Sequence, residues 1–422
     1  MRRTPISLFL IISCTTLVLA AEPAPVNDTG DGFTLDNAVS AALGKNPELR
    51  VFEASIASAK GGVATARAIP NPELSVAPGM KRIHEGGAAM NEFHANVELS
   101  QLIEFPGKRA LRVAIAERNV AVARVAIEGF RFQLSAKVRQ AFYELLAAQK
   151  TVELRKEQVG AAQTFVASAV KRTESGYASD FEIVKSQSEV IAAKKALSEA
   201  EGRVVAAQVD LNTLMGCSPS VALEVRGSLE GSAPAGSKAD HLALAMAKNP
   251  SLRTQYLQAE TAGLNLRATR FGKRPDFAVG PQVEYTRSEK IYGIGVTVAL
   301  PLWNKKEGEI QTATADERKA VAEIEKLRLE ITGAVTKATA NLQVARDQLT
   351  LYTPKFLSKL KTFVAQAQES YAKNSTTLII YLDAKRTYFD TLSDYYEALG
   401  KVAACRAQLE SAVGVPLDTT KP

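Results

Sequence analysis

The sequence is poor in the residues that usually hold metals or form cross-links. Its 422 residues include only three cysteines and three histidines. Their spacing is unlike that of a zinc site, so we predict no metal site and no cofactor. An oxidising compartment would permit a disulfide between Cys217 and Cys405, and two free thiols are the alternative. The six residues are Cys14, Cys217, Cys405, His84, His94 and His241.

Long apolar runs are also scarce, and the clearest one lies at the N-terminus. Arg2 and Arg3 precede an apolar stretch that ends in "VLAAEPAP". This pattern predicts a signal peptide over residues 1–21, and therefore an exported protein. Cys14 follows "IIS", which weakly resembles a lipoprotein box, so lipidation of Cys14 is an alternative. Beyond residue 21 we find no apolar run near the roughly 20 residues that a membrane-spanning helix needs. The chain would then be soluble after export, unless strands cross a membrane.

The chain lacks the arrangements that indicate catalysis or nucleic-acid binding. We find no nucleophile-base pair, phosphate loop or metal constellation, so we predict no catalytic residue and no enzyme. The formal net charge is +7, but basic and acidic residues alternate along the chain. This favours solvated helix surfaces over a nucleic-acid site.

The chain contains the same patterns twice. "NPELR" from Asn46 is followed 203 residues later by "NPSLR", and "TFVASA" from Thr164 is followed 198 residues later by "TFVAQA". A period this long predicts a duplicated domain and not a solenoid. We place a first repeat at 22–225, a linker at 226–238, a second repeat at 239–416 and a tail at 417–422, because "RGSLEGSAPAGSK" has linker composition.

Each repeat is predicted to begin with a short helix and a β-hairpin, at 72–103 and 276–302. Apolar and polar residues alternate in these segments, as in Phe93, Val97 and Leu99 against His94 and Asn96. About ten residues of this kind suffice for a tilted strand to cross a bilayer. The alternative is an ordinary hairpin half buried on a soluble core. Four strands cannot close a barrel, so in a membrane several chains must share one, and three would give twelve strands.

Helical hairpins follow at 108–216 and 305–414. Each long helix would extend on the order of 100 Å, and Pro354 is predicted to kink the second. Apolar residues recur every seventh position, which predicts left-handed supercoiling. At the two tips, Gly176 and Asn374 suit a left-handed helix end, and Ser179 and Thr377 suit N-caps. The heptad positions are Val138, Leu145, Val152, Val159 and Val166, then Val335, Leu342, Leu349, Phe356 and Phe363.

This combination resembles the TolC family of bacterial outer-membrane efflux channels, over about residues 33 to 416. The resemblance rests on the two "NP" helices, on "QLIEFPGKR" and "LPLWNKK" after the strands, on the two tips, and on "VDLNTLMG" and "AQLESAVG". It implies a mainly α fold with a membrane β portion. Three chains would form a homotrimer with a long coiled-coil α-barrel in the periplasm and a 12-stranded β-barrel, four strands per chain, in outer-membrane lipid.

The resemblance also implies partners and site residues. A periplasmic adaptor (membrane fusion protein) would contact the tips, and an inner-membrane transporter of the resistance-nodulation-division (RND) type would drive export. The implied adaptor contacts are Gly176, Ala178, Ser179, Glu182, Ile183, Asn374 and Thr377. The implied periplasmic constriction is Tyr371, Asp383 and Glu182.

The chain departs from the family pattern at the constriction. Thr376 stands where an arginine is expected and Ile380 where an aspartate is expected, which predicts a weaker or differently built closure. Three copies of Asp383 on one axis would favour cations; the alternative is a solvated carboxylate.

The resemblance implies a passive exit duct of a tripartite efflux system. "EFPGKR" and the overall proportions resemble the heavy-metal branch, which exports cobalt, zinc, cadmium or copper. Drug or small-molecule efflux and type I secretion are alternatives within the family. Alternatives of other classes are the periplasmic adaptor itself and a purely structural coiled-coil protein.

Overall fold

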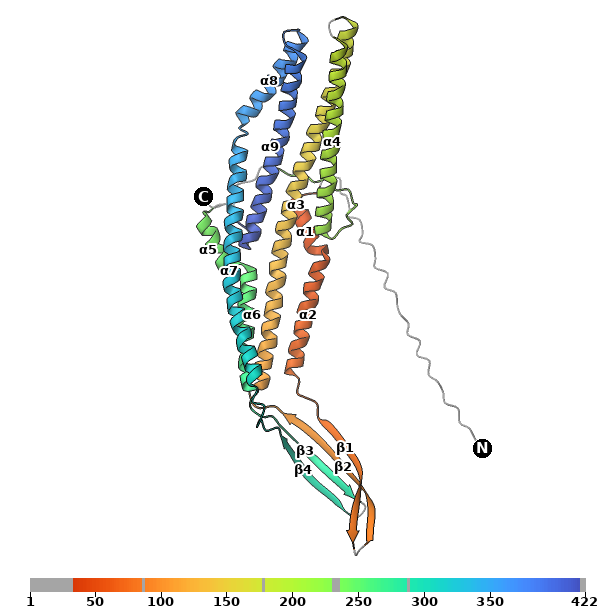
Figure 1. The fold of residues 1–422 in the computed structure, drawn as a ribbon, viewed down its shortest axis with the longest axis vertical. Helices are drawn as coiled ribbons and strands as arrows, with labels where there is room; N and C mark the ends of the chain where they lie inside the picture. Colours follow the sequence, from red (N-terminus) through yellow and green to blue (C-terminus); the bar gives the residue numbers. More distant parts are fainter. Residues whose placement is uncertain (1–32, 86–87, 177–178, 230–235, 287–288, 418–422) are drawn as a thin grey trace, which may run out of the picture.

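The chain folds into an elongated molecule with a β-sheet at one end and the tips of two helical hairpins at the other (Figure 1). The computed structural model describes residues 33–85, 88–176, 179–229, 236–286 and 289–417. The predicted signal peptide with Cys14, as well as Ala178 and residues 418–422 of the predicted tail, lie outside the described residues.

Two helices, and not the single short one predicted, precede each pair of strands. They are α1 (Leu35–Lys45) and α2 (Pro47–Arg67) in the first half, and α5 (Lys238–Lys248) and α6 (Pro250–Phe271) in the second. The break lies at the Asn-Pro step in both, because a residue before proline is driven out of the helical region. Each asparagine then caps the second helix, as the Asn46 side chain accepts a hydrogen bond from the Glu48 N–H at 2.9 Å.

The same asparagines join the short helices to the ends of the long hairpins. Asn46 Nδ2 donates to the Leu214 carbonyl at 2.8 Å, near the end of α4 (Asp180–Met215). Asn249 Nδ2 donates to the Ala412 carbonyl at 3.3 Å, near the end of α9 (Leu378–Val413). The repeated Asn-Pro pattern therefore marks two equivalent junctions.

Glycine is required where these junctions close. Gly216 and Gly414 end α4 and α9 with φ of 69° and 86°, in the left-handed region. A Cβ on Gly216 would lie 2.7 Å from the Lys45 carbonyl oxygen, and one on Gly414 would lie 2.8 Å from Pro250 Cδ. Both conformation and space exclude a larger residue.

The four strands form one antiparallel sheet in the order β1-β2-β3-β4. The strands are β1 (Glu73–Glu85), β2 (Ala88–Ile103), β3 (Phe277–Thr286) and β4 (Lys290–Val298), so both predicted hairpins are confirmed. Pairing of β2 with β3 joins the two halves. Val97 lies opposite both Val76 and Val283, and Val283 lies opposite Tyr292. The apolar residues of all four strands therefore share one face.

That apolar face is exposed in the single chain. Ile294 is 76% exposed and Tyr292 is 73% exposed. On the opposite face polar side chains contact each other, with His94 Nε2 lying 3.0 Å from Glu284 Oε1. The sheet extends beyond the helices (Figure 1). The alternative of a hairpin half buried on a soluble core is therefore wrong.

An aspartate joins the sheet to the long helix α3 (Lys108–Glu174). Asp276, directly before β3, accepts hydrogen bonds from the Phe105 N–H at 2.7 Å and from Lys108 Nζ at 2.8 Å. Burial alone would raise the pKa of Asp276, but these hydrogen bonds and the charges of Lys108 and Lys306 outweigh it and lower the pKa. The carboxylate thus stays ionised and fixes the strand-to-helix turn in "EFPGKR".

Pro354 begins a helix, and the structure has a break between two helices where a kink in one helix was predicted. The second long segment divides into α7 (Glu307–Thr350) and α8 (Pro354–Ala372). Thr353 Oγ1 accepts a hydrogen bond from the Phe356 N–H at 3.2 Å and caps α8, whose first turn tolerates proline. The heptad pattern fails at the same place. Val138, Leu145, Val335 and Leu342 are buried, whereas Phe356 and Phe363 are 45% and 50% exposed.

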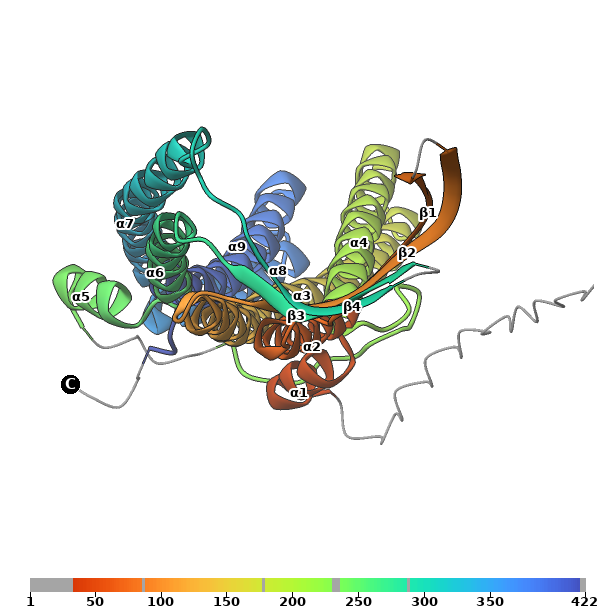
Figure 2. The ribbon, with the colours of Figure 1, turned by 90° about the horizontal axis from the view of Figure 1, so that it is seen from below.

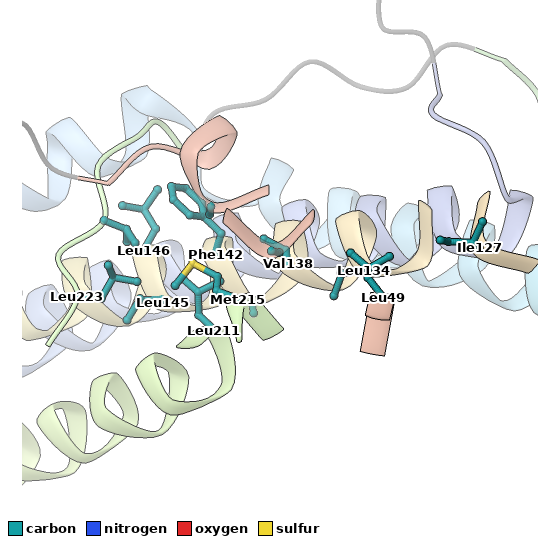
Figure 3. Close-up of a cluster of buried hydrophobic side chains, with 14 residues drawn as sticks. Leu49, Ile127, Leu134, Val138, Phe142, Leu145, Leu146, Leu211, Met215 and Leu223 are labelled. Carbon is teal, nitrogen blue, oxygen red and sulfur yellow. The ribbon is translucent and has the colours of Figure 1, made fainter. Parts of the chain in front are cut away.

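Two apolar clusters hold the helices together. The first packs α1, α3 and α4 around Phe142, Leu145, Leu211 and Met215 (Figure 3). The second packs α5, α7 and α9 around side chains such as Val335 and Leu409. Cys217 lies against the first cluster and Cys405 in the second, and both are free thiols, so the disulfide alternative is wrong. Viewed along the molecule, the helices form a curved layer with α1 and α5 on its convex side (Figure 2).

Candidate functional site

The tips of the two helical hairpins carry the candidate site, because most of the predicted functional residues lie there. Gly176 and Asn374 have φ of 77° and 58°, so the left-handed helix ends are confirmed. Ser179 and Thr377 occupy the N-cap positions, as predicted, but their side chains make no capping hydrogen bond. At Ser179 the Glu182 N–H is already bonded to the backbone carbonyl at 2.9 Å.

A hydrogen bond joins the two hairpins of the chain just behind the tips. The Tyr371 hydroxyl, on α8, donates to Glu182 Oε2, on α4, at 2.6 Å. Burial, followed by the hydrogen bond and charge of Glu182, raises the pKa of Tyr371 to about 12. Tyr371 is therefore a neutral donor at physiological pH, and the carboxylate side chain of Glu182 is the acceptor.

Arg172, which the sequence analysis missed, completes this contact. Its guanidinium donates to the Tyr371 carbonyl at 3.1 Å and to Asn374 Oδ1 at 2.5 Å. It also lies 4.5 Å from the centre of the Tyr371 ring, at cation-π distance. Thr376 replaces the arginine expected in the second tip, and Arg172 supplies one from the first. The available signal was an arginine in the last turn of α3, four residues before Gly176.

Three aromatic rings, those of Phe165, Tyr371 and Tyr381, pack together at this contact. The Tyr371 and Tyr381 rings stack with centroids 5.3 Å apart, and Phe165 lies 5.1 Å from Tyr381. Lys385 lies 5.0 Å above the Tyr381 ring and donates to the Ala161 carbonyl at 3.3 Å. Burial raises the pKa of Tyr381 to about 12 and lowers the pKa of Lys385. This packing fixes α8 and α9 against α3.

Asp383 lies apart from this contact. Its side chain is exposed on α9, whereas the neighbouring Leu382 and Ala384 are buried. The structure thus brings together Glu182, Tyr371 and Asn374, and leaves Asp383 on a free face of the helix. Ile380, which replaces the expected aspartate, is also exposed.

The described residues contain neither a group of metal ligands nor a membrane-spanning helix. In the described ranges, no three or more histidine, cysteine, aspartate or glutamate side chains are placed to hold a metal ion. No helix of the described part combines the length and apolar character needed to span a membrane.

Comparison with known sequences identifies the family. The sequence profile of the outer membrane efflux proteins matches residues 38–217 and 242–415, which is most of the chain. The chain belongs to the outer membrane efflux protein family. This efflux protein is an outer-membrane component, so the adaptor and structural coiled-coil alternatives are wrong.

This efflux protein is similar in sequence to two metal-resistance proteins and in fold to one solved structure. It is 26% identical over 386 residues to the cobalt-zinc-cadmium resistance protein CzcC of Cupriavidus metallidurans, covering 90% of each chain. It is 23% identical over 343 residues to the nickel-cobalt-cadmium resistance protein NccC of Alcaligenes xylosoxydans xylosoxydans, covering 80% of this chain and 74% of NccC. The crystal structure of CusC aligns with a TM-score of 0.74 at 17% identity over 90% of this chain and 92% of CusC, and shows the same fold.

Proposed function

We propose that this protein is the passive outer-membrane exit duct of a heavy-metal efflux system. The observation that carries the proposal is the similarity to the cobalt-zinc-cadmium resistance protein over 90% of both chains. The similarity to a nickel-cobalt-cadmium resistance protein supports the same substrate class. The duct itself performs no chemistry; an inner-membrane RND-type transporter supplies the energy through a periplasmic adaptor.

The working form is a homotrimer with one shared barrel. Each chain supplies an open sheet of four strands with an exposed apolar face. In lipid, each unpaired backbone N–H or C=O group on an open sheet edge destabilises the structure by roughly several kcal/mol. Pairing β1 of one chain with β4 of the next removes these edges and turns the apolar face to outer-membrane lipid. Three chains then give a 12-stranded barrel above a tube of long helices. The paired arrangement of equivalent junctions also supports an internally duplicated chain.

The adaptor binds at the tips. Four of the residues proposed for this contact are exposed, namely Gly176, Ser179, Asn374 and Thr377. Large apolar side chains are exposed beside them, with Phe181 on α4 and Ile379 on α9. Exposed apolar groups of this size suit a packed protein contact. The occupant that fits is the helical end of a periplasmic adaptor.

The contact among Arg172, Glu182 and Tyr371 holds the closed state. It joins α3 and α4 to α8, so the two hairpins of one chain cannot separate while it is intact. Asp383, on the free face of α9, faces the axis of the trimer and favours cations. Opening requires the Tyr371–Glu182 bond to break.

Growth of a deletion strain tests the function. The strain, an isogenic parent and a complemented strain are compared on cobalt, zinc, cadmium, nickel, copper and silver salts, and on dyes and antibiotics. We expect sensitivity to divalent metals only, restored by complementation. Sensitivity to dyes and antibiotics alone would contradict the metal assignment and place the protein in multidrug efflux. Complementation with a variant truncated at the tips is expected to fail, because the adaptor contact is lost.

A further inference from the structure

A cavity of about 800 Å³ lies on the side of the helical layer that carries α1, away from the tip contact. Its walls come from α1, α3, α7, α9 and the joint between α7 and α8. Figure 2 shows α1 on the convex side of the layer. Cavities that hold small organic ligands have volumes of roughly 300 to 1,000 Å³. The space is therefore large enough for a molecule of that class.

Three arginines from three helices line this cavity, together with one buried carboxylate. Arg139 on α3, Arg346 on α7 and Arg406 on α9 all line it. Glu410 is 3% exposed and lies 3.2 Å from Arg139 Nη1 and 3.5 Å from Arg406 Nε. The other carboxylate on the wall, Asp36, is exposed. The cavity wall thus carries three guanidinium groups and one buried carboxylate, which leaves an excess of positive charge.

Two of these guanidinium groups have buried donors without an acceptor. Among the described residues, neither Arg346 Nη2 nor Arg139 Nε has a hydrogen-bond partner, although both atoms are enclosed. Burial, and then the charge of Arg406, lowers the pKa of Arg346. Buried donors normally have a partner, and an unsatisfied one in a native structure requires an explanation. An anion between the arginines would supply the missing acceptors.

Much of the remaining wall is apolar. Leu35, Leu229, Leu342, Leu349 and Val402 line the cavity beside the arginines. An inorganic anion would fill only a small part of the volume and would leave this surface uncovered. The combination matches a molecule with a charged head and an apolar body.

We propose that this cavity binds an amphiphilic organic anion, whose head lies between Arg139, Arg346 and Arg406 and whose body covers the apolar wall. Guanidinium groups bind carboxylate and phosphate oxygens in pairs, so either head is compatible. The occupant would also contact Thr353 and Pro354 at the joint between α7 and α8. Because α8 carries Tyr371, binding would hold the joint in its present form. The proposal rests on this geometry and is independent of the exported substrate.

Binding of octanoate to the purified full-length protein in a non-ionic detergent tests the proposal. Isothermal titration calorimetry compares octanoate with octanamide, which has the same body and no charge, with octyl phosphate, and with inorganic phosphate. We expect octanoate or octyl phosphate to bind at least about tenfold more tightly than either octanamide or inorganic phosphate. The stronger of the two then identifies the preferred head. Equal affinity for octanamide, equal affinity for inorganic phosphate, or no binding of either amphiphile would overturn the proposal.

Two variants locate the site. Arg346→Met is expected to weaken binding at least about tenfold, since it removes the guanidinium with the unsatisfied donor. It should fold, because it removes a buried charge that lies close to another. Arg318→Met, on the exposed surface of the same helix, has the same change in charge and should bind normally. Unchanged binding by Arg346→Met, or equal losses in both variants, would overturn the site.

A third variant tests the charge balance by a separate measurement. Glu410→Gln leaves three arginines without their carboxylate, so we expect a lower melting temperature that octanoate raises again. The rise should exceed the rise that octanoate gives in the unsubstituted protein. An equal or smaller rise would contradict the excess of positive charge as the basis of binding.

Discussion

The Tyr371 hydroxyl donates a hydrogen bond of 2.6 Å to Glu182, a residue on a different helical hairpin of the same chain. Tyr371 is 6% exposed, so the bond forms largely out of water. Its position behind the tips makes it the contact that must break when the hairpins separate. The predictions on closure below follow from this relationship.

Tyr371→Phe removes the hydroxyl and leaves the ring in place. The expected loss is about 1.5 to 3 kcal/mol, the range for a hydrogen bond to a charged group. Because the loss is local, amides of the two tips should exchange hydrogen faster. Planar-bilayer recordings should show a larger mean conductance. Tyr292→Phe, on the exposed face of the sheet, is the matched control and should change neither quantity. A double-mutant cycle with Glu182→Gln that gives no coupling energy would contradict the bond.

The pKa values of Tyr371 and Tyr381 predict a loss of tip stability at alkaline pH. An unfolded tyrosine titrates near pH 10, whereas each of these retains its proton to about pH 12 in the folded state. The folded state therefore binds more protons between these values. The stabilisation that these two tyrosines contribute is fully present below pH 10. Above pH 10 the free energy of unfolding falls by at most about 1.4 kcal/mol per pH unit for each tyrosine.

The titration of Tyr371 can be isolated by comparison with Tyr371→Phe. The Tyr371 ring is surrounded by Glu182, Arg172 and Tyr381, and Lys385 lies over the Tyr381 ring. The lowered pKa of Lys385 changes stability with pH in the opposite direction. These groups are present in both proteins and largely cancel in the difference. We expect the difference in melting temperature to be constant from pH 8 to 10 and to shrink above about pH 10. A constant difference up to pH 11.5 would exclude the raised pKa.

Arg172→Ala should loosen the tip as Tyr371→Phe does. It removes two hydrogen bonds and a ring contact, and we expect a loss of about 1 to 3 kcal/mol. Lys171→Ala removes the same charge from the adjacent, exposed position and should have little effect. Limited proteolysis at the tips measures the difference. A double-mutant cycle with Asn374→Ala should show coupling, because Arg172 Nη2 lies 2.5 Å from Asn374 Oδ1.

Substitutions of Asn46 separate its two tasks. Asn46→Asp keeps an oxygen that can cap α2 but loses the donor to the Leu214 carbonyl. Asn46→Ala loses both. We expect Asn46→Ala to cost about 1 to 3 kcal/mol more than Asn46→Asp if capping dominates. Asn249 holds the equivalent place in the second half, so its two variants should follow the same order in melting temperature. Equal losses in the two variants of both halves would assign the main role to the hydrogen bond that the asparagine donates to the end of the long hairpin.

Asp383→Asn should reduce the preference of the open channel for cations. The carboxylate is exposed on α9, and in a trimer three copies would concentrate negative potential on one axis. Reversal potentials under a salt gradient measure the change. Asp316→Asn, on α7, loses the same charge at an exposed site far along the chain and should leave selectivity unchanged. Unchanged selectivity in Asp383→Asn would exclude this residue as the filter.

Local patterns in the sequence predicted most of the elements. Strict alternation gave the strands, and the register confirms that Val97, Val283 and Tyr292 share a face. Gly176, Asn374, Gly216 and Gly414 lie where helices end, because such ends need a left-handed residue. The predicted start of the first helical hairpin, at residue 108, is the start of α3.

Contacts between distant segments explain what the sequence analysis missed. Arg172 lies 199 residues from Tyr371, and nothing in its own surroundings indicates that partner. The predicted constriction groups Asp383 with Tyr371, and within the single chain Asp383 lies on an exposed side of α9, apart from the Tyr371 contact. The predicted heptad pattern likewise continued past Thr350, where α7 ends.

The sequence by itself determined most of the secondary structure and the two equivalent junctions, because backbone geometry and side-chain periodicity act over a few residues. Only the tertiary structure decided which charges meet. The contact of Arg172 with Asn374 and the contacts of Arg139 and Arg406 with Glu410 depend on how long helices pack side by side. A small rotation of any of these helices would place the same side chains in water, and no local pattern specifies that rotation.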